Sequence, residues 1–349
     1  MCTCVVTPDL IDSIISTELI KVRLKEINPY YVAGFFYTKY GQKQLLRISS
    51  GAVNPVITRD LFKSVFVPLP PASFQEKIES YVKEAYEKRK IADEKYKKAE
   101  ELLNKTLGIE KLEFQQEKVF EVRFDEVEQT LRFDAEHYQP KYEQVKKFIT
   151  DSGYKVKKLK EVVEISDEKI DPSSQPTKLF NYIELANVDP STGEIEEINQ
   201  VKGYNAPSRA RMLVKKGDIL VSSLLGSLDN VGLVSDEFDG AVASTGFFVI
   251  RSKFFLPEFL FLLFKSNLMR LQLEEKTAGA IMSAVPKTTF GDLLIPIVSE
   301  QTQRQISDLV RQSFLLRKES KELIEKAKRE IEEFVEKGIQ NKPPLTSDS

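Results

Sequence analysis

The stretch Gln75–Leu107, QEKIESYVKEAYEKRKIADEKYKKAEELLNKTL, decides the fold, because it reads as one long charged helix with a second copy later in the chain. Its apolar or small residues recur every three or four positions, which is typical of a coiled coil. A helix of about 36 residues is a rod of roughly 54 Å. The second copy lies 228 positions further on, at residues 303–335, and reads QRQISDLVRQSFLLRKESKELIEKAKREIEEFV.

The repeat is longer than the helix, since residues 4–107 align with residues 232–335 without a gap. Ser16-Thr17 falls on Ser244-Thr245, and Gly51-Ala52 falls on Gly279-Ala280. The chain is therefore interpreted as a duplicated module whose first copy lacks its front part. This predicts a first-copy remnant at 1–70, a first long helix at 71–110, a complete globular domain at 118–296, a second long helix at 298–338 and a disordered tail at 339–349.

The two long helices are expected to pack on each other. Neither is apolar enough to stand alone, and the small residues on each seam favour close approach of helices. Because a globular segment separates them in sequence, an antiparallel coiled coil is the simplest arrangement. Its predicted seam consists of Ile78, Val82, Ala85, Ala99, Leu103, Ile306, Val310, Ile324, Ala327 and Ile331.

Composition is that of an ordinary protein with a hydrophobic core: 349 residues, 41% apolar, 30% charged and a formal net charge of −2. That balance neither supports nor excludes nucleic-acid binding, because a local basic face is what meets phosphates. Cys2 and Cys4 could bind a metal, but the single histidine, His137, leaves too few ligands for a zinc site. No apolar run is long enough for a membrane span. A cytoplasmic protein without metal is expected.

No motif supports catalysis. Asn28-Pro29-Tyr30-Tyr31 is close to the Asn-Pro-Pro-Tyr of adenine N6-methyltransferases, but the second proline is missing. Its repeat is Leu256-Pro257-Glu258-Phe259, so both prolines are interpreted as first residues of helices. The chain has no glycine-rich loop for S-adenosylmethionine and no nucleotide-binding loop. His137 stands beside two carboxylates with no nucleophile motif, and a surface role is expected for it.

Residues 118–296 predict an α+β domain of mixed or antiparallel strands with short helices. A short basic helix is expected at Pro140–Ile149, and a further helix at Pro257–Leu273. Strand-like runs alternate with turns between them, as at Asn181–Leu185 before the turn Asp189–Gly193.

Polar and basic clusters at the turns of this domain are candidates for contact with DNA. An arginine fork suits guanine O6/N7 or a phosphate pair. Serines at strand ends and a small loop with free backbone N–H groups could approach phosphate. Taken singly, each could equally be an ordinary hydrophilic turn. The candidates are Arg209, Arg211, Lys215, Ser222, Ser223, Ser227, Ser244, Thr245, Lys276 and Gly279.

Several of these segments match a known pattern. RFDAEHYQP at 132–140, APSRAR at 206–211 with GDIL at 217–220, ASTGF at 243–247 and TAGAIM at 277–282 occur in this order. A helix start with Pro296 and Gln303 follows. The chain resembles the specificity subunit of type I restriction–modification systems over essentially residues 4–337.

The resemblance implies a non-catalytic protein that reads double-stranded DNA. In that family each target recognition domain reads one half of a split sequence, and the two helices form an antiparallel coiled coil that spaces the half-sites. The helices also dock adenine-N6 methyltransferase subunits, and restriction/translocase subunits join them. S-adenosylmethionine, ATP and Mg²⁺ are then expected only on partner subunits, with no cofactor on this chain.

The chain departs from the family plan because the counterpart of residues 118–231 is absent from the first copy. We therefore expect an N-terminally truncated subunit that forms a homodimer or takes the missing part from a complementing chain. The alternative is a coiled-coil scaffold that holds methyltransferase subunits and reads little sequence.

Overall fold

The computed structural model describes residues 3–7, 13–51, 56–111, 117–196, 198–252, 254–278 and 283–340. It forms two compact units: unit 1 comprises Met1–Asp93 and Leu315–Ser349, and unit 2 comprises Glu94–Phe314. Each long helix contributes to both units, whereas the sequence-based division gave each helix a domain of its own. None of the helices formed by these residues combines the length and apolar character that a membrane crossing needs.

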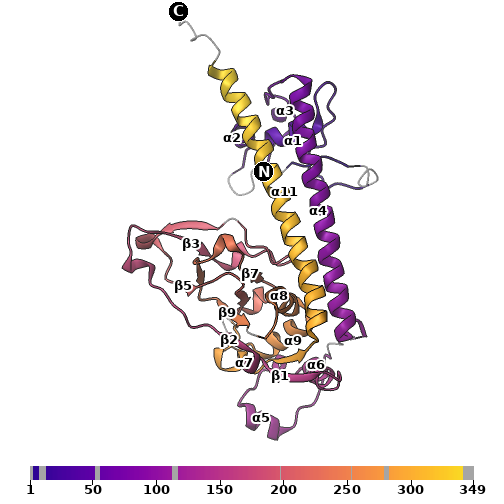
Figure 1. Cartoon of the computed structure of the whole chain (residues 1–349), viewed down its shortest axis with the longest axis vertical. Helices are drawn as coiled ribbons and strands as arrows, with labels where there is room; N and C mark the ends of the chain where they lie inside the picture. The colour runs from indigo at the N-terminus through magenta and orange to yellow at the C-terminus, as the bar shows by residue number, and fades with distance from the viewer. Residues whose placement is uncertain are drawn as a thin grey trace, which may run out of the picture. The chain divides into compact units, whose positions relative to one another are not determined.

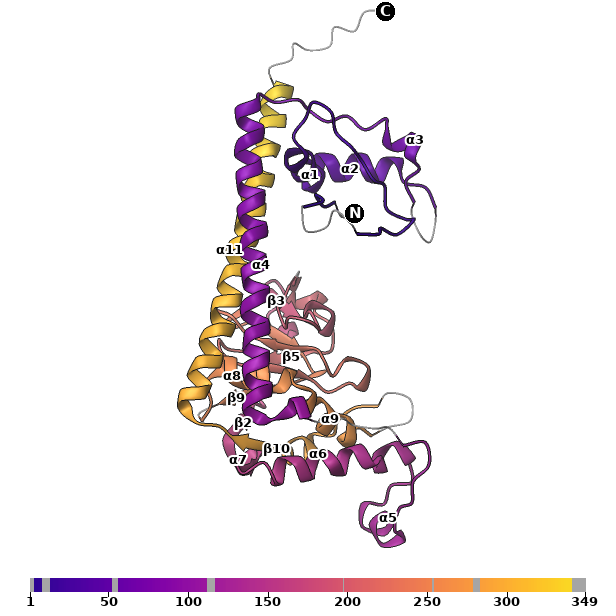
Figure 2. The same cartoon turned by 90° about the vertical axis from the view of Figure 1, so that its right-hand side faces the viewer.

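Unit 1 consists of three short helices packed on segments of the two long ones (Figures 1 and 2). Tyr31 and Phe35 of α1 form a buried cluster with Ile78 of α4 and Ala327 and Ile331 of α11. Its helices are α1 (Pro29–Tyr37), α2 (Lys39–Ile48), α3 (Arg59–Phe62) and parts of α4 (Ala72–Leu107) and α11 (Glu300–Gln340).

Within unit 1 the two long helices run antiparallel. Tyr81 Oη lies 3.2 Å from Glu330 Oε1, Lys88 Nζ 2.8 Å from Glu319 Oε2, and Arg317 Nη2 2.5 Å from Asp93 Oδ1. Residue numbers therefore increase along α4 while those of their partners decrease along α11. The predicted antiparallel pairing is confirmed here.

The same pairing occurs in unit 2, where Lys95 Nζ donates to Gln312 Oε1 at 2.7 Å. Over both units, eight of the ten predicted seam residues are buried, and Val82 and Ile324 are half-buried. The first long helix ends at Leu107, because Gly108 adopts φ +71°. The second begins at Glu300 and extends to Gln340, into the range expected to be disordered; residues 341–349 lie outside the described residues.

Unit 2 contains three small sheets. β1 (Lys155–Lys158) pairs with β10 (Leu294–Ile297). A four-stranded antiparallel sheet has the order β2 (Val163–Ile165), β9 (Phe247–Ser252), β6 (Ile219–Ser222) and β7 (Val231–Leu233). A second has the order β4 (Asn199–Lys202), β3 (Leu179–Ile183), β8 (Val242–Ser244) and β5 (Ala210–Leu213), in which β3 and β8 are parallel.

Unit 2 also contains the helices α5 (Phe124–Thr130), α6 (Pro140–Thr150), α7 (Leu159–Val162), α8 (Pro257–Lys265), α9 (Asn267–Lys276) and α10 (Lys287–Phe290), of which α5 buries no residue. Short 3₁₀ turns occupy Ile109–Lys111, Ala135–Tyr138, Pro172–Ser174, Leu185–Asn187, Gly203–Asn205, Leu225–Ser227 and Asp236–Phe238. The predicted α+β class with mixed and antiparallel strands is confirmed.

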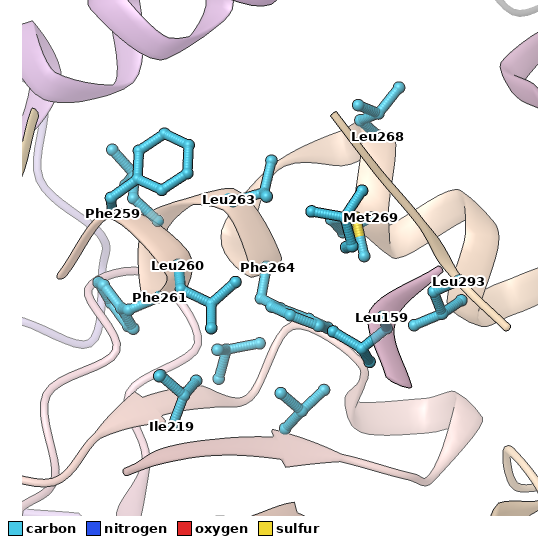
Figure 3. Close-up of a cluster of buried hydrophobic side chains, with 14 of the residues drawn as sticks. Leu159, Ile219, Phe259, Leu260, Phe261, Leu263, Phe264, Leu268, Met269 and Leu293 are labelled. Carbon is cyan, nitrogen blue, oxygen red and sulfur yellow. The ribbon is translucent and has the colours of Figure 1, made fainter. Parts of the chain in front are cut away.

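The core of unit 2 lies between α8 and the sheet that contains β6. All four residues of β6 are buried, and the first three, Ile-Leu-Val, are apolar. Figure 3 shows Phe264 pointing from α8 toward Leu159. Burying such side chains stabilises the fold by about 1.5–3 kcal/mol each relative to leaving them in water.

The predicted helix Pro257–Leu273 is two helices. Ser266 has the extended angles φ −70° and ψ 151°, and its hydroxyl caps α9 by accepting from the Met269 amide. Pro257 is the first residue of α8 and Pro29 that of α1, as predicted. The Asn28 side chain has a structural role rather than a base-binding one, because it caps α1 by accepting from the amides of Tyr30 and Tyr31.

The helix bounds follow the 228-residue repeat. Helices α1, α2 and α3 begin and end 228 residues before α8, α9 and α10, and α4 begins 228 residues before α11. Hydrogen bonds repeat as well: Gln75 Oε1 accepts from the Asn28 amide at 2.9 Å, and Gln303 Oε1 from the Leu256 amide at 3.2 Å. The two units therefore share one helical framework, although only unit 2 has sheets on it in the part of the chain described.

Candidate nucleic-acid interface

The N-terminal end of β5 presents the most exposed of the predicted arginines. Arg209 precedes the first residue of β5 and is exposed. Its carbonyl accepts from the amide of Thr245, which is also exposed, at 2.8 Å. Ala210 donates to the carbonyl of Pro207 at 2.9 Å, closing the turn before the strand. No ion pair of Arg209 occurs within the described residues, so its guanidinium is available to an anion.

Two further loops meet this end of the sheet. Ser223 donates from its amide and its hydroxyl to the carbonyl of Gly246, both at 2.9 Å. Leu225, which is partly exposed, donates its amide to the carbonyl of Ser283 at 2.9 Å. We call the surface formed by Arg209, Ser223, Leu225 and Thr245 the Arg209 rim. Its residues come from three loops, and the loop at Ser283 adjoins them.

Three of the predicted serines have structural roles instead. Ser222 and Ser244 are buried, with 0% and 2% of their surface exposed. Ser222 Oγ lies 2.9 Å from Ser227 Oγ, and Ser244 Oγ accepts from the Gly246 amide at 3.2 Å. Burial contradicts the DNA contact predicted for Ser222 and Ser244. Ser227 is half-buried and holds the turn after β6.

Arg211 and Lys215 both have carboxylate partners. Arg211, within β5, pairs with Asp171 at 3.1 Å. A hydrogen bond from the Ser173 hydroxyl, with a smaller effect of Arg211, holds the pKa of Asp171 below its usual value. Lys215 follows the opposite end of β5, where its Nζ lies 2.8 Å from Glu168 Oε2. Contacts of Arg211 and Lys215 with DNA stay predictions, although each side chain already has a carboxylate partner.

Lys276, the last residue of α9, is half-buried and lies 3.4 Å from Glu275. Glu275 is buried and also pairs with Lys146 at 2.9 Å, and its carbonyl lies 3.0 Å from His137 Nδ1. His137 therefore has a structural contact. Gly279, the other candidate in this loop, lies outside the described residues.

A second polar group was missed by sequence reasoning. Gln200 of β4 donates to Asn181 of β3 at 3.2 Å, and both line a cavity of about 470 Å³ together with Lys178. Nearby, Lys202 lies 6.0 Å from the ring centre of the exposed Tyr204. Side-chain amides suit adenine and lysines suit phosphate. The two side-chain amides and the lysine of the stretch 199–202 were the sequence signal that could have revealed this group.

Within the described residues, no group of three or more His, Cys, Asp or Glu side chains could hold a metal ion. The exposed polar side chains of the Arg209 rim are the guanidinium of Arg209 and the hydroxyl of Thr245, which suit an anionic ligand.

The sequence is similar to a known protein family and to known members of it. The family described as type I restriction modification DNA specificity domain matches residues 151–333. The HindI specificity subunit of Haemophilus influenzae is 34% identical over 119 residues, which are 33% of this chain and 25% of that protein.

Two structures are also similar in part. The HsdS subunit from Thermoanaerobacter tengcongensis has 31% identity and a TM-score of 0.42 over 56% of this chain and 51% of that one. The type I restriction–modification S subunit from M. genitalium has 14% identity and a TM-score of 0.45 over 89% of this chain and 70% of that one. The chain thus spans a quarter of the HindI subunit and about half of the Thermoanaerobacter subunit.

The family match covers more than half of the chain. The chain belongs to the type I restriction–modification DNA specificity domain family.

Proposed function

We propose that this chain is a non-catalytic specificity subunit whose domain at residues 118–296 reads one half-site of a bipartite double-stranded DNA target. The observation that carries the proposal is the Arg209 rim. There, an exposed arginine with no ion pair in the described residues is held by a backbone hydrogen bond from Thr245 where three loops meet. Such a guanidinium can form two hydrogen bonds to guanine O6/N7 and so discriminate a base pair by about 1–3 kcal/mol.

Ser223 and Thr245 support this role as neighbouring hydroxyl groups on the rim. Thr245 is exposed and can donate to a base edge or a phosphate. Arg211 and Lys215 are proposed as phosphate contacts or as structural ion pairs rather than as base readers, because each already has a carboxylate partner. Lys276 has a carboxylate neighbour as well, and it remains a candidate for a phosphate contact.

The long helices are proposed to dock adenine-N6 methyltransferase subunits. In unit 1, Ile91 of α4 and Leu315 of α11 expose 42% and 55% of their surfaces although they lie on a paired helix. Exposed apolar side chains on a helix pair suit contact with a further helix. S-adenosylmethionine would then be bound by the methyltransferase subunits, and ATP and Mg²⁺ by restriction/translocase subunits.

Reconstitution with methyltransferase subunits of this family tests both parts together. We expect adenine methylation at one sequence motif, set by the chain. Ile91→Asp and Leu315→Asp should weaken co-purification with the methyltransferase, whereas Lys318→Ala, at an exposed α11 position, should not. Methylation without sequence preference would contradict the reading role.

The second candidate function is a scaffold that holds methyltransferase subunits and reads little DNA. The exposed apolar residues on the helices favour it, since they would suffice for docking without the Arg209 rim. The two candidate functions predict different results for one variant. A scaffold would co-purify with the methyltransferase, and Arg209→Ala would not change its DNA binding or the methylation of DNA.

A further inference from the structure

The segment 117–138, which lies between α4 and α6 in the sequence, exposes much of its apolar surface. In the described part of unit 2, the four most exposed of the large apolar side chains all belong to it. Val119, Phe133 and Leu131 expose 87%, 86% and 80% of their surfaces, and Phe124 exposes 71%. Helix α5, in the middle of the segment, buries no residue and lies at the outer end of unit 2, away from the sheets (Figures 1 and 2). An apolar patch of this kind on a folded domain marks a surface for a partner.

Two of these side chains, Val119 and Phe133, line a groove. Its volume is about 440 Å³, and its apolar lining includes Val119, Phe120, Val122, Val127 and Phe133. Arg132 and Tyr138 line it as well, and hydrogen bonds hold them in place. Tyr138 Oη donates to the Arg132 carbonyl at 2.8 Å, and Arg132 Nε donates to Asp134 Oδ1 at 2.9 Å. A groove of this size and apolar character can receive a few apolar side chains of a partner.

The charge of the segment restricts the kind of partner. Residues 117–138 contain seven Asp or Glu side chains but only three Lys or Arg side chains. Two of the three cations, Arg123 and Arg132, are already paired with a carboxylate two residues further on. Glu121, Glu126 and Glu128 are exposed, have no ion pair within the described residues, and lie next in sequence to residues that line the groove. Carboxylates that are available to a cation therefore accompany the apolar lining.

We infer that this groove is a docking site for a basic amphipathic helix of a partner protein. Such a helix carries an apolar stripe that fits the groove and lysines or arginines beside the stripe that pair with the carboxylates. DNA is excluded as the occupant, because its phosphates would meet carboxylates. A second copy of the chain docked through the same face is excluded as well, because two acidic surfaces would meet. The inference is independent of DNA reading and of the docking proposed for the long helices.

Binding of a designed peptide to the full chain tests the inference. The probe is a fluorescent amphipathic peptide of leucine and lysine, about 18 residues long so that it can form a helix. Its twin carries glutamate in place of lysine. We expect the lysine peptide to bind at least about tenfold more tightly than the glutamate peptide, because only the lysine peptide complements the carboxylates. Fluorescence anisotropy measures both affinities, and the difference between the two peptides should shrink at high salt.

Two substitutions in the groove locate the contact. Phe133→Asp and Val119→Asp each place a charge in the apolar lining and should weaken binding of the lysine peptide at least about tenfold. Phe254→Asp is the matched control, since Phe254 is 56% exposed elsewhere in unit 2, and it should leave the affinity unchanged. Because Phe133 and Val119 bury little surface, denaturant unfolding should show both variants to be as stable as the wild type.

Charge reversal tests the carboxylates. Glu126→Lys combined with Glu128→Lys should weaken binding of the lysine peptide at least about threefold. Glu237→Lys combined with Glu322→Lys changes the net charge equally at exposed positions elsewhere, and it should have little effect. Three results would overturn the inference: no binding of the lysine peptide, equal binding of both peptides, or binding that is unchanged in the aspartate variants or in the lysine variant of the groove. None of these results bears on DNA reading.

Discussion

Arg317 gives the sharpest prediction about the helix pair of unit 1. It belongs to α11, is 2% exposed and donates to Asp93 of α4 at 2.5 Å. Truncation to alanine removes a long buried side chain, and we expect Arg317→Ala to lower the free energy of unfolding by about 3–5 kcal/mol. Arg317→Met keeps an unbranched apolar chain without a charge, so it should lie within about 1 kcal/mol of the wild type.

The carboxylate partner should matter less. Asp93 has 57% of its side chain exposed, so water screens its attraction to the arginine. Asp93→Ala should therefore cost about 1–2 kcal/mol, below the loss that a fully buried pair would show. In a protein that already carries Arg317→Met, Asp93→Ala should leave the free energy of unfolding unchanged. The difference between the effects of Asp93→Ala in the two proteins is the coupling energy of the pair.

Denaturant unfolding followed by helical circular dichroism measures these values, and hydrogen exchange at residues 78–93 assigns them to unit 1. Arg89→Met serves as the control, because Arg89 is a half-buried neighbour that lies 3.8 Å from the same carboxylate. If Arg317→Met were as destabilising as Arg317→Ala, the charge rather than the packing of the side chain would hold the helices. That result would refute the reasoning.

Two other predictions concern unit 2. Gly193 has φ +72°, and a Cβ there would lie 2.4 Å from the ring of Phe261 and 2.6 Å from the Val231 carbonyl. Gly193→Ala should therefore lower the free energy of unfolding by more than about 2 kcal/mol in thermal or denaturant unfolding. Gly226→Ala, in open space, should change it by less than about 0.5 kcal/mol, and equal effects of the two substitutions would contradict the geometry. Hydrogen bonds from Lys215 and then Arg251 lower the pKa of Glu168, so its contribution to stability is present above the unfolded pKa and is lost as pH falls through the folded one. Glu168→Gln should thus be less stable than the wild type at pH 7, with a difference that shrinks below about pH 4 in unfolding measured against pH; a difference independent of pH would contradict it.

The helical framework was predictable because its signals are local and occur twice. Pro29 and Pro257 mark helix starts, Gly108 marks a helix end, and the repeat doubles the evidence for each. The seam was predictable for the same reason, since a period of three to four residues identifies the packed face of a helix. Ser266 was missed as a break because the apolar run around it continues with helical spacing on both sides.

The strands and the candidate interface were less predictable because their geometry depends on pairing between distant segments. The parallel contact of β3 with β8 has no local signal. A serine at a strand end can face either side, so the burial of Ser222 and Ser244 follows only from the sheet order. Arg209 and Lys215 are close in sequence, yet β5 separates them, and only its direction shows that they lie at opposite ends.

The central claim is that unit 2 reads DNA sequence through the Arg209 rim, and selection from a random double-stranded DNA library by the full chain tests it most directly. Arg304→Ala is the matched control, since Arg304 is an exposed arginine of unit 2 that pairs with Glu300 on the surface of α11. We expect the wild type and Arg304→Ala to enrich the same short half-site, and Arg209→Ala to lose about 1–3 kcal/mol of discrimination at one base pair. Enrichment of no sequence by the wild type, or of an unchanged half-site with unchanged discrimination by Arg209→Ala, would contradict the claim.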